Sequence, residues 1–379
     1  MKINVLHVCD KLGRKGSSIH GVSRLFSWWW PLFDKDRFDV GLINLRHQDG
    51  ANQFLQEKGV KLKSLGKGKF NFLAYRDIVR MIHKEEIDVL HLHGYGASNI
   101  GIVASHITGI KCIVHEHFVD PVYPVYQRPF DYLFGRYSDK GIAVSQSVKM
   151  FMVDRRHIPK HKIDIIYNGA PINDFVKRDD DAIQIEKKRL GIPSNVPVIA
   201  TIGRMDEQKG NLYFIEAAKI LLQKGCQAKF ILAGDGPLLE YLKSKCKQLD
   251  ISDHIIFTGH YKDIPLLQSL IDIQVFPSLW EGTPLTIFEA FAMGLPVVST
   301  NVDGLGEVVK NNVTGLVVPP RDGRAIADRI LALINNPDKS KRLAINAHKE
   351  SATYDIKRCV HKIESIYSNF FTEVPGKGH

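Results

Sequence analysis

The chain has 379 residues, 44% hydrophobic and 24% charged, which is typical of a globular protein and long enough for two domains. No apolar run approaches the roughly 20 residues of a membrane-spanning helix, and the first strand-like run is too short and wrongly flanked for a signal peptide, so we expect a cytoplasmic protein. The five cysteines are scattered and none lies in a C-x-x-C pair, which argues against a disulfide framework or a cysteine zinc site. The net charge of +10 permits an anionic partner.

Short β-branched runs alternate with helical patterns through the first half of the chain. Helices are predicted at 72–86 and 99–109, between runs that are typical of strands. This alternation indicates a parallel sheet covered by helices. The predicted strands are 3–10, 38–45, 60–66, 87–94, 111–117, 140–145 and 162–169.

The same alternation begins again near residue 196. Helices are predicted at 211–225, 237–250 and 284–294. Two doubly wound parallel sheets in series follow, which is an α/β fold. The predicted strands of the second half are 196–203, 228–234, 254–259, 273–278, 296–300 and 315–320.

A charged, Asp-rich stretch without a strand pattern separates the two halves. We expect a first domain at 1–172, a linker at 173–195 and a second domain at 196–356. A final helical segment is predicted at 357–379.

The residues that follow the strands of the second half indicate a phosphate site. In open parallel sheets, ligands lie beyond the carboxyl ends of the strands, and two facing sheets would hold a ligand in the cleft between them. Arg204 and Lys209 follow the strand at 196–203, Gly234 begins the tight turn "GDGP", and Glu281 lies in the loop after 273–278. Fixed cations beside glycine turns and helix N-termini favour phosphate, so we expect a diphosphate group.

Six motifs in this order carry a resemblance to a known family. They are "AVSQSVKMFM", "IIYNGAPINDF", "GRMDEQKG", "AGDGP", "PSLWEGTPLTIFEAFAMGLPVVSTNVDGLGEVV" and "TGLVVPPRD". Together they resemble family 4 of the retaining glycosyltransferases, most strongly from about residue 140 to 325. The resemblance implies the GT-B fold, in which two Rossmann-like domains face each other across a cleft and the final helix crosses back to the first domain.

The resemblance also implies roles for residues of the second half. Arg204 and Lys209 match the basic pair that holds the donor diphosphate. Glu281 matches the first glutamate of the family's E-x7-E motif, which approaches the donor sugar, and Glu289 matches the second, which binds the ribose; for Glu289 alone, a helix-surface carboxylate is the alternative. Backbone amides near the helix start would serve the phosphate. The predicted donor-binding residues are Gly21, Arg204, Lys209, Gly234, His260, Tyr261, Glu281, Gly282, Thr283, Leu285, Thr286 and Glu289.

In the first half, a loop with Gly13, Gly16 and Gly21 resembles the family's glycine loop, although His20 replaces one of its two adjacent glycines. His115 and His117 both match the histidine that the family places near the reacting sugar, and His117 is preferred. The predicted catalytic residues are His115, His117, Arg204, Lys209 and Glu281.

No metal site is predicted. The imidazoles of His115 and His117 are expected to point to opposite faces, and no third ligand is evident. His91 and His93, at the same spacing, are expected to serve strand-end packing and a loop contact. Asp179–Asp181 imitate the Asp-x-Asp metal motif of another glycosyltransferase fold, but in a linker they are expected to be a solvated charge run.

We therefore expect a retaining glycosyltransferase that uses a nucleotide diphosphate sugar, with UDP and GDP both open, and that requires no cofactor. The acceptor would be a glycan or lipid-linked sugar in cell-surface polysaccharide, lipopolysaccharide or glycolipid synthesis. The run Trp28–Trp30 with nearby basic residues is either core packing or a patch touching the inner face of an anionic membrane. The alternatives are a sugar-nucleotide epimerase or hydrolase, or a nonenzymatic nucleotide-sugar or nucleic-acid binder; basic residues interleaved with aromatic ones are not evident, so no nucleic acid is expected.

Overall fold

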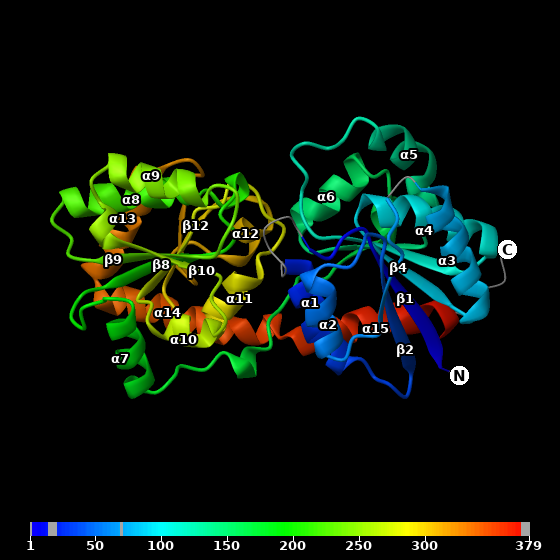
Figure 1. The fold of residues 1–379 in the computed structure, drawn as a ribbon, viewed down its shortest axis with the longest axis horizontal. Helices are drawn as coiled ribbons and strands as arrows, with labels where there is room; N and C mark the ends of the chain where they lie inside the picture. Colours follow the sequence, from blue (N-terminus) through cyan, green and yellow to red (C-terminus); the bar gives the residue numbers. More distant parts are fainter. Residues whose placement is uncertain (1, 14–20, 69–70, 373–379) are drawn as a thin grey trace. The chain divides into compact units, whose positions relative to one another are not determined.

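The computed structural model describes residues 2–13, 21–68 and 71–372. The chain divides into two compact units, drawn in Figure 1. Unit 1 is Met1–Asn168 together with Ile356–His379, and unit 2 is Gly169–Asp355. The chain therefore leaves the first unit once and returns to it through its last helix, α15 (Ile356–Thr372).

Unit 1 contains a seven-stranded parallel sheet in the order β3-β2-β1-β4-β5-β6-β7. Its strands are β1 (Ile3–Cys9), β2 (Phe38–Asn44), β3 (Leu62–Ser64), β4 (Val89–His93), β5 (Lys111–Glu116), β6 (Lys140–Ala143) and β7 (Ile163–Ile165). Its other helices are α1 (Gly21–Trp29), α2 (Gly50–Glu57), α3 (Phe72–Lys84), α4 (Tyr95–Thr108), α5 (Gln127–Phe134) and α6 (Gln146–Asp154).

Unit 2 repeats the plan with a six-stranded parallel sheet in the order β10-β9-β8-β11-β12-β13. Its strands are β8 (Val198–Ile202), β9 (Lys229–Ala233), β10 (Ile255–Gly259), β11 (Ile273–Phe276), β12 (Val297–Thr300) and β13 (Leu316–Val318). Its helices are α7 (Asp180–Arg189), α8 (Asn211–Gln223), α9 (Leu239–Gln248), α10 (Ile264–Ser269), α11 (Leu285–Ala292), α12 (Asp303–Val308), α13 (Gly323–Ile334) and α14 (Pro337–Ser351). The two doubly wound parallel sheets predicted from the sequence are confirmed.

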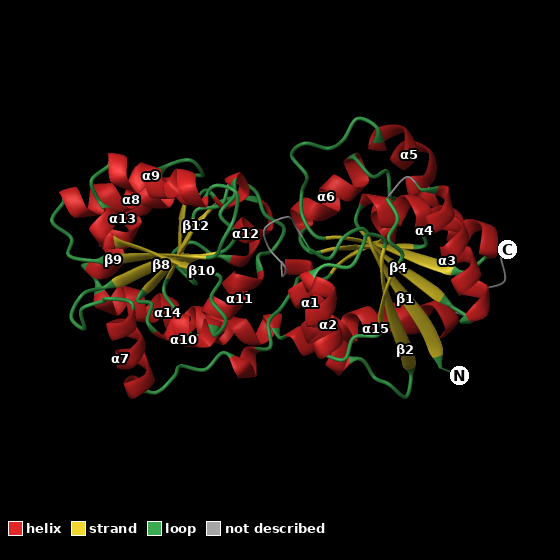
Figure 2. Cartoon of the chain, in the orientation of Figure 1, coloured by secondary structure: helices red, strands yellow, loops and turns green. Residues whose placement is uncertain are grey.

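Helices lie on both sides of each sheet (Figure 2). For this reason the central strands are buried on both faces: every residue of β4 and of β8 is buried. In unit 2, Phe214 of α8 packs edge-on against Phe230 of β9, with ring centroids 6.1 Å apart. These buried sheets are the rigid supports from which the loops at the strand ends project.

The strand order reverses direction between β1 and β4 in unit 1 and between β8 and β11 in unit 2. The crevice beyond the carboxyl ends of the strands at such a switch point is where open α/β sheets bind ligands. Each unit thus provides one such place, and the polar residues there are the ones to examine for function.

The fold adds detail to one expectation and decides between the alternatives of another. The predicted linker at 173–195 contains helix α7, which begins at Asp180 because the side chain of Asp179 accepts a hydrogen bond from the Ala182 amide and caps the helix. Trp29 and Trp30 are 0% and 8% exposed. They pack inside unit 1, so the membrane patch loses its aromatic anchor and the core-packing alternative holds for both.

The basic run 61–70, which was the other part of that possible patch, is also partly neutralised. Lys61 lies 2.6 Å from Asp39, Lys63 lies 2.7 Å from Glu85, and Lys67 contacts Asp77. Lys69 and Phe70 of the same run lie outside the described residues. Among the described residues, no helix is long and apolar enough to cross a membrane.

Candidate functional site

The loops after β8 and β11 meet at the switch point of unit 2. The main-chain amide of Leu279 donates to the carbonyl of Gln208 at 2.8 Å, which joins the two loops directly. Gly210 makes this approach possible, since it has a φ of +61° and a Cβ there would lie 2.0 Å from the carbonyl oxygen of Pro277. Side chains from the two loops are therefore held at a fixed separation.

Lys209 and Glu281 contact each other across this junction. The Lys209 ammonium lies 2.5 Å from Glu281 Oε1, and the Glu281 side chain is only 6% exposed. Ser278 Oγ donates to the same carboxylate oxygen at 3.0 Å, and the Gln208 side-chain amide reaches the other at 3.4 Å. The carboxylate is thus fixed by hydrogen bonds and in turn fixes the position of the lysine charge.

Asp303 supports the Glu281 loop through a hydrogen bond to its main chain. Its Oδ2 accepts a hydrogen bond from the Glu281 main-chain amide at 2.9 Å, and its backbone has a φ of +36°. Burial raises the pKa of the Asp303 carboxyl above its usual value, while that accepted hydrogen bond lowers it. No role was assigned to Asp303, Ser278 or Gln208 from the sequence. They lie in the segments that follow β12, β11 and β8, and that position was the available signal.

Arg204 follows β8 and lies on the same edge of the sheet. Its Nε is 3.1 Å from Asp206 Oδ2, and its side chain is 21% exposed. Gly234, after β9, adjoins this loop: with a φ of +135°, a Cβ there would lie 2.0 Å from the Gly203 carbonyl oxygen. The turn after β9 and the cationic loop after β8 therefore pack backbone to backbone.

Helix α11 begins directly behind the Glu281 loop. Gly282 and Thr283 are buried, and the helix starts at Leu285 with Thr286 as its second residue. Glu289 lies just over one turn into the helix and is 0% exposed, so it is not a helix-surface carboxylate. The first amides of α11 have no partner within the helix and carry its positive dipole end, a favourable setting for an anion.

His260 and Tyr261 follow β10, two strands from β8 in the same sheet. His260 is exposed, whereas the Tyr261 hydroxyl donates to Glu186 of α7. Burial, followed by this hydrogen bond, raises the pKa of Tyr261 to about 12. Their predicted contact with the nucleotide base stays a prediction.

In unit 1, five histidines gather on one face of the sheet near its switch point. They are His7 on β1, His91 and His93 on β4, and His115 and His117 on and just after β5. His93 and His115 are register partners, and His93 Nδ1 lies 2.9 Å from His117 Nε2. The prediction that His115 and His117 point to opposite faces is wrong, because residues two apart on a strand share a face.

His91 and His93 were expected to serve strand-end packing and a loop contact. They also form hydrogen bonds with other side chains. Both bind other imidazoles through their ring nitrogens, and His91 also binds the Tyr367 hydroxyl at 2.6 Å. His115 is 1% exposed, whereas His117 is half-buried. Of the two histidines matched to the reaction centre, His117 is therefore the accessible one.

Two groups of these imidazoles lie close enough to hold a metal ion: His7 with His91 and His93, and His93 with His115 and His117. In the first group all three ring planes are within 28° of one another. A metal lies in the plane of each imidazole that binds it, and near-parallel stacked rings do not aim their lone pairs at one point. In the first group this geometry suits hydrogen bonds between rings better than a shared ion.

The glycine loop of unit 1 is described only in part. Gly16 and His20 lie outside the described residues. Gly21 is the exposed first residue of α1, and no heavy atom lies within 4 Å of a Cβ built there. Gly13 has no such room, because a Cβ would lie 2.4 Å from Asp49 Oδ2.

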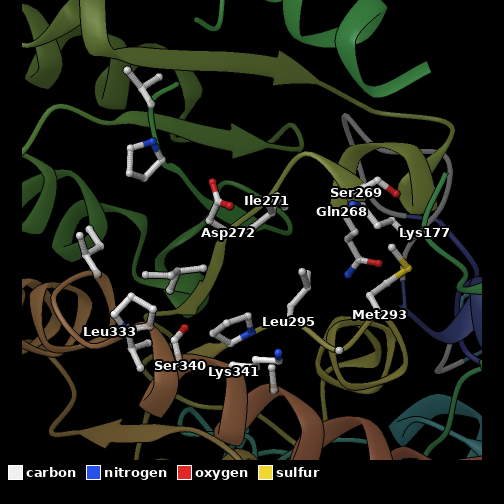
Figure 3. A pocket seen from close by; sticks show the side chains of 18 of the residues that line it. Lys177, Gln268, Ser269, Ile271, Asp272, Met293, Leu295, Leu333, Ser340 and Lys341 are labelled. Atoms are coloured by element: carbon white, nitrogen blue, oxygen red, sulfur yellow. The ribbon is translucent and has the colours of Figure 1, made fainter. Parts of the chain in front are cut away.

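A cavity of about 690 Å³ lies elsewhere in unit 2 (Figure 3). It is bordered by the amino ends of β8, β11 and β12, at residues such as Pro197, Asp272 and Pro296. Lys177, Lys341 and Met293 are among its other lining residues. None of the predicted site residues lines it, so this cavity is at the opposite edge of the sheet from the candidate site.

Comparisons with known proteins give matches in both units. A family model described as "Glycosyl transferases group 1" matches residues 182–350, and one described as "Glycosyltransferase Family 4" matches residues 32–174. The Escherichia coli UDP-Gal:alpha-D-GlcNAc-diphosphoundecaprenol alpha-1,3-galactosyltransferase is 25% identical over 92% of this chain and 94% of its own. The Staphylococcus aureus capsular polysaccharide biosynthesis glycosyltransferase CapM is 29% identical over 62% and 63% of the two chains.

Solved structures support the fold. A glycosyltransferase from Rickettsia africae superposes with a TM-score of 0.86 at 22% identity, covering 98% of this chain and 100% of that one. The Anabaena protein HepE in complex with UDP superposes with a TM-score of 0.83 at 23% identity, covering 97% and 100%. Both likenesses extend over the two units.

Proposed function

The chain belongs to glycosyltransferase family 4, the "glycosyl transferases group 1" with the GT-B fold, and from this premise we propose that it moves a hexosyl group from UDP-hexose to an acceptor hydroxyl with retention at the anomeric carbon. UDP is favoured over GDP because the Escherichia coli relative is named for UDP-Gal and the Anabaena structure contains UDP. The sequence alone left the two bases open.

One observation carries the proposal: the ion pair between Lys209 and Glu281 at the switch point of unit 2. A buried carboxylate that holds a lysine in place presents a positive charge without the cost of reorienting it when the diphosphate leaves. We assign Lys209 and Arg204 to the donor diphosphate. Glu281, at the same point, accepts hydrogen bonds from hydroxyls of the transferred sugar.

We assign the remaining donor contacts to residues at the same edge of the sheet. The main-chain amides of Leu285 and Thr286 at the start of α11 bind phosphate oxygens, and Glu289 accepts the ribose hydroxyls. Gly282 and Gly234 let the backbone approach the donor closely, and Thr283 lies in the same loop as Gly282. His260 and Tyr261 lie beside the base.

Unit 1 supplies the acceptor side of the reaction in this proposal. His117 lies at the reacting sugar, and Gly21 belongs to the glycine loop that faces the diphosphate and acceptor. The acceptor oxygen attacks from the face that the diphosphate leaves, and its proton passes to the departing phosphate oxygen. No protein nucleophile and no metal ion is required, since the cationic residues stabilise the leaving charge.

The proposed acceptor is a lipid-linked sugar or a growing surface glycan, because relatives are named for a diphosphoundecaprenol acceptor and for capsular polysaccharide biosynthesis. Reaching it would place the protein at the inner face of the membrane. The α5 surface supports such contact, because it combines exposed apolar side chains with cations. It consists of Val122, Val125, Tyr126, Arg128, Tyr132, Leu133 and Arg136.

A screen for acceptor-dependent release of UDP tests the function. The purified chain is mixed with UDP-galactose, UDP-glucose or their N-acetyl forms, with and without undecaprenyl-diphosphate sugars, and UDP and glycan products are measured. We expect UDP release only when an acceptor is present, with an α-linked product from an α-linked donor. Release of UDP or isomerised sugar without an acceptor would favour the hydrolase or epimerase, and binding without turnover would favour a nucleotide-sugar binding protein.

A further inference from the structure

Asp303 has a backbone conformation that residues with a side chain rarely adopt. Its φ of +36° lies in the region that favours glycine, and below the range of about +50° to +70° that left-handed residues usually occupy. The other five described non-glycine residues with positive φ have values from +49° to +64°. Such strain persists only where surrounding contacts hold it, and it is concentrated at functional sites.

Contacts on both sides of Asp303 hold this conformation. Before it, Thr300 Oγ1 donates to the main-chain carbonyl of Ser278 at 2.7 Å, which ties the end of β12 to the loop after β11. After it, Leu305 of α12 is 0% exposed and packs in the interior of unit 2. The backbone at Asp303 therefore has little freedom to relax toward a commoner conformation.

The side chain of Asp303 binds the main chain of Glu281 from this position. Asp303 Oδ2 accepts a hydrogen bond from the Glu281 amide at 2.9 Å. Because Glu281 is 4% exposed, its amide needs an acceptor within the protein, and a carboxylate is a strong one. Glycine at position 303 would relieve the backbone but would supply no acceptor. The acceptor therefore explains why an aspartate occupies a position whose backbone favours glycine.

Asp303 differs from the groups that hold the Glu281 side chain. Lys209 contacts that carboxylate, but in the proposed function its charge also binds the donor diphosphate, so the contact is shared once the donor arrives. Ser278 and Gln208 bind the carboxylate oxygens, which would also receive sugar hydroxyls. The hydrogen bond from the Glu281 main chain to Asp303 involves none of the atoms assigned to the donor. It can hold Glu281 in one place before and during the reaction.

We propose that Asp303 is a positioning residue for glycosyl transfer: its carboxylate holds the Glu281 main chain where the Glu281 side chain meets the donor sugar, and the strained backbone at 303 is retained for this contact. The inference rests on the proposed function in assigning Glu281 to the sugar. Asp303 acts through Glu281 and is not itself a catalytic residue. Its value lies in geometry, because a small misplacement of a group that orients the substrate greatly reduces the rate.

Two substitutions separate the acceptor from the charge and from the backbone. Asp303→Asn keeps an acceptor oxygen and tolerates a positive φ, but removes the charge. Asp303→Gly suits the backbone and removes the acceptor. We expect Asp303→Asn to retain kcat for transfer within about threefold. We expect Asp303→Gly to lower kcat by about tenfold, less than the 10²-fold that a displacement of 1 Å can cost.

The affinity for UDP distinguishes a positioning role from a general loss of structure. UDP lacks the sugar that Glu281 is assigned to bind, so both Asp303 variants should bind UDP within about twofold of the wild type in isothermal titration. Asp250→Gly is the matched control. Asp250 is an exposed aspartate of unit 2 with a φ of +53°, so the same replacement is made on a similar backbone. We expect it to leave kcat and UDP affinity unchanged.

Hydrogen exchange of the Glu281 amide provides a test that needs no substrate. With the full chain alone, peptides that contain Glu281 are followed by mass spectrometry. We expect slow exchange at this amide in the wild type, in Asp303→Asn and in Asp250→Gly, and faster exchange in Asp303→Gly. The wild-type measurement depends on no variant.

Four results would overturn the inference. They are rapid exchange of the Glu281 amide in the wild type, full transfer activity in Asp303→Gly, an equal loss of kcat in Asp303→Asn and Asp303→Gly, and a loss of UDP affinity as large as the loss of kcat in Asp303→Gly. The third would mean that charge matters and the acceptor geometry does not. If the wild type transfers no sugar, the proposed function fails, and the exchange rates alone decide whether Asp303 holds Glu281.

Discussion

Each unit places its candidate functional residues at the switch point of its parallel sheet. The residues differ in charge: unit 2 has charged side chains there, and unit 1 has neutral imidazoles. Unit 2 presents charges at its switch point, with Lys209 and Arg204 each beside a carboxylate and about one-fifth exposed. Unit 1 presents neutral rings that are almost all buried. The difference matches what each would bind in a glycosyl transfer: a diphosphate needs fixed cations, and a sugar hydroxyl needs an oriented neutral acceptor.

The largest expected effect concerns the charged residues of unit 2. Lys209→Ala should lower kcat/KM for transfer by about 10²- to 10³-fold, because it removes a preorganised cation from the leaving diphosphate. Steady-state kinetics with a UDP-sugar and an acceptor measure the loss. Lys224→Ala is the control, since Lys224 pairs with Asp328 on the surface of the same unit. Equal activity of the two variants would contradict the assignment of Lys209 to the donor diphosphate.

Acid should destabilise unit 1, because its buried histidines are neutral in the folded state. The pKa values of His7, His91, His93 and His115 are lowered in the folded state, so below pH 6.5 the unfolded chain binds protons that the folded one does not. Stability of unit 1 should therefore fall as pH falls from 6.5 toward 3, with a slope approaching four protons, at about 1.4 kcal/mol per proton and pH unit.

Urea unfolding from pH 7.5 to 4.5, followed by tryptophan fluorescence in a Trp280→Phe background, measures that slope for unit 1. In this background the remaining tryptophans, Trp28–Trp30, all belong to unit 1. His161→Gln, which changes an exposed histidine of the same unit, should leave the slope as it is. A slope of less than one proton would mean that the rings are not held neutral.

The roles of the two glutamates in unit 2 can be separated by binding. Glu289→Gln should weaken UDP by about 10- to 100-fold, since hydrogen bonds to a charged group contribute about 1.5–3 kcal/mol. Glu281→Gln should leave UDP affinity nearly unchanged but reduce transfer, because its partner is the sugar. Isothermal titration with UDP measures both, with Glu240→Gln on the surface of α9 as control. The opposite order of UDP affinities would reverse the two assignments.

The strands and several contacts of the charged site were predictable from sequence because they are local. Periodicity located all the strands, and Lys209 and Glu281 each lie in the segment after one, where parallel strands bring their loops to one edge. Glu289 could be placed in its helix by spacing. Its complete burial could not be predicted, since burial depends on what packs against α11.

The hydrogen bonds between the unit 1 histidines and Tyr367 could not be predicted for the same reason. They join β1, β4, β5 and α15, and no local pattern ties Tyr367 to His7 or His91. A correct use of strand periodicity would have put His91 with His93, and His115 with His117, on one face each. It would not have shown that the faces coincide or that α15 covers them. Helix α7 was missed because its charged sequence lacks an apolar stripe.

The smallest expected effect concerns the membrane. Val125→Ser with Leu133→Ser on the α5 surface should lower binding to anionic liposomes by roughly fivefold, since each exposed apolar side chain contributes only part of its full burial energy. Liposome flotation measures it. Ile185→Ser, an exposed apolar residue of α7, should change nothing. Wild-type protein that does not float with anionic liposomes would contradict the role of this surface.

The most direct test of the central claim is the dependence of UDP release on acceptor, read together with the anomeric configuration of the product by proton NMR. With the donor sugar that raises the melting temperature most, we predict UDP release only in the presence of acceptor and an α-linked product. UDP release at the same rate without acceptor, or a β-linked product, would contradict a retaining transfer built on Lys209 and Glu281.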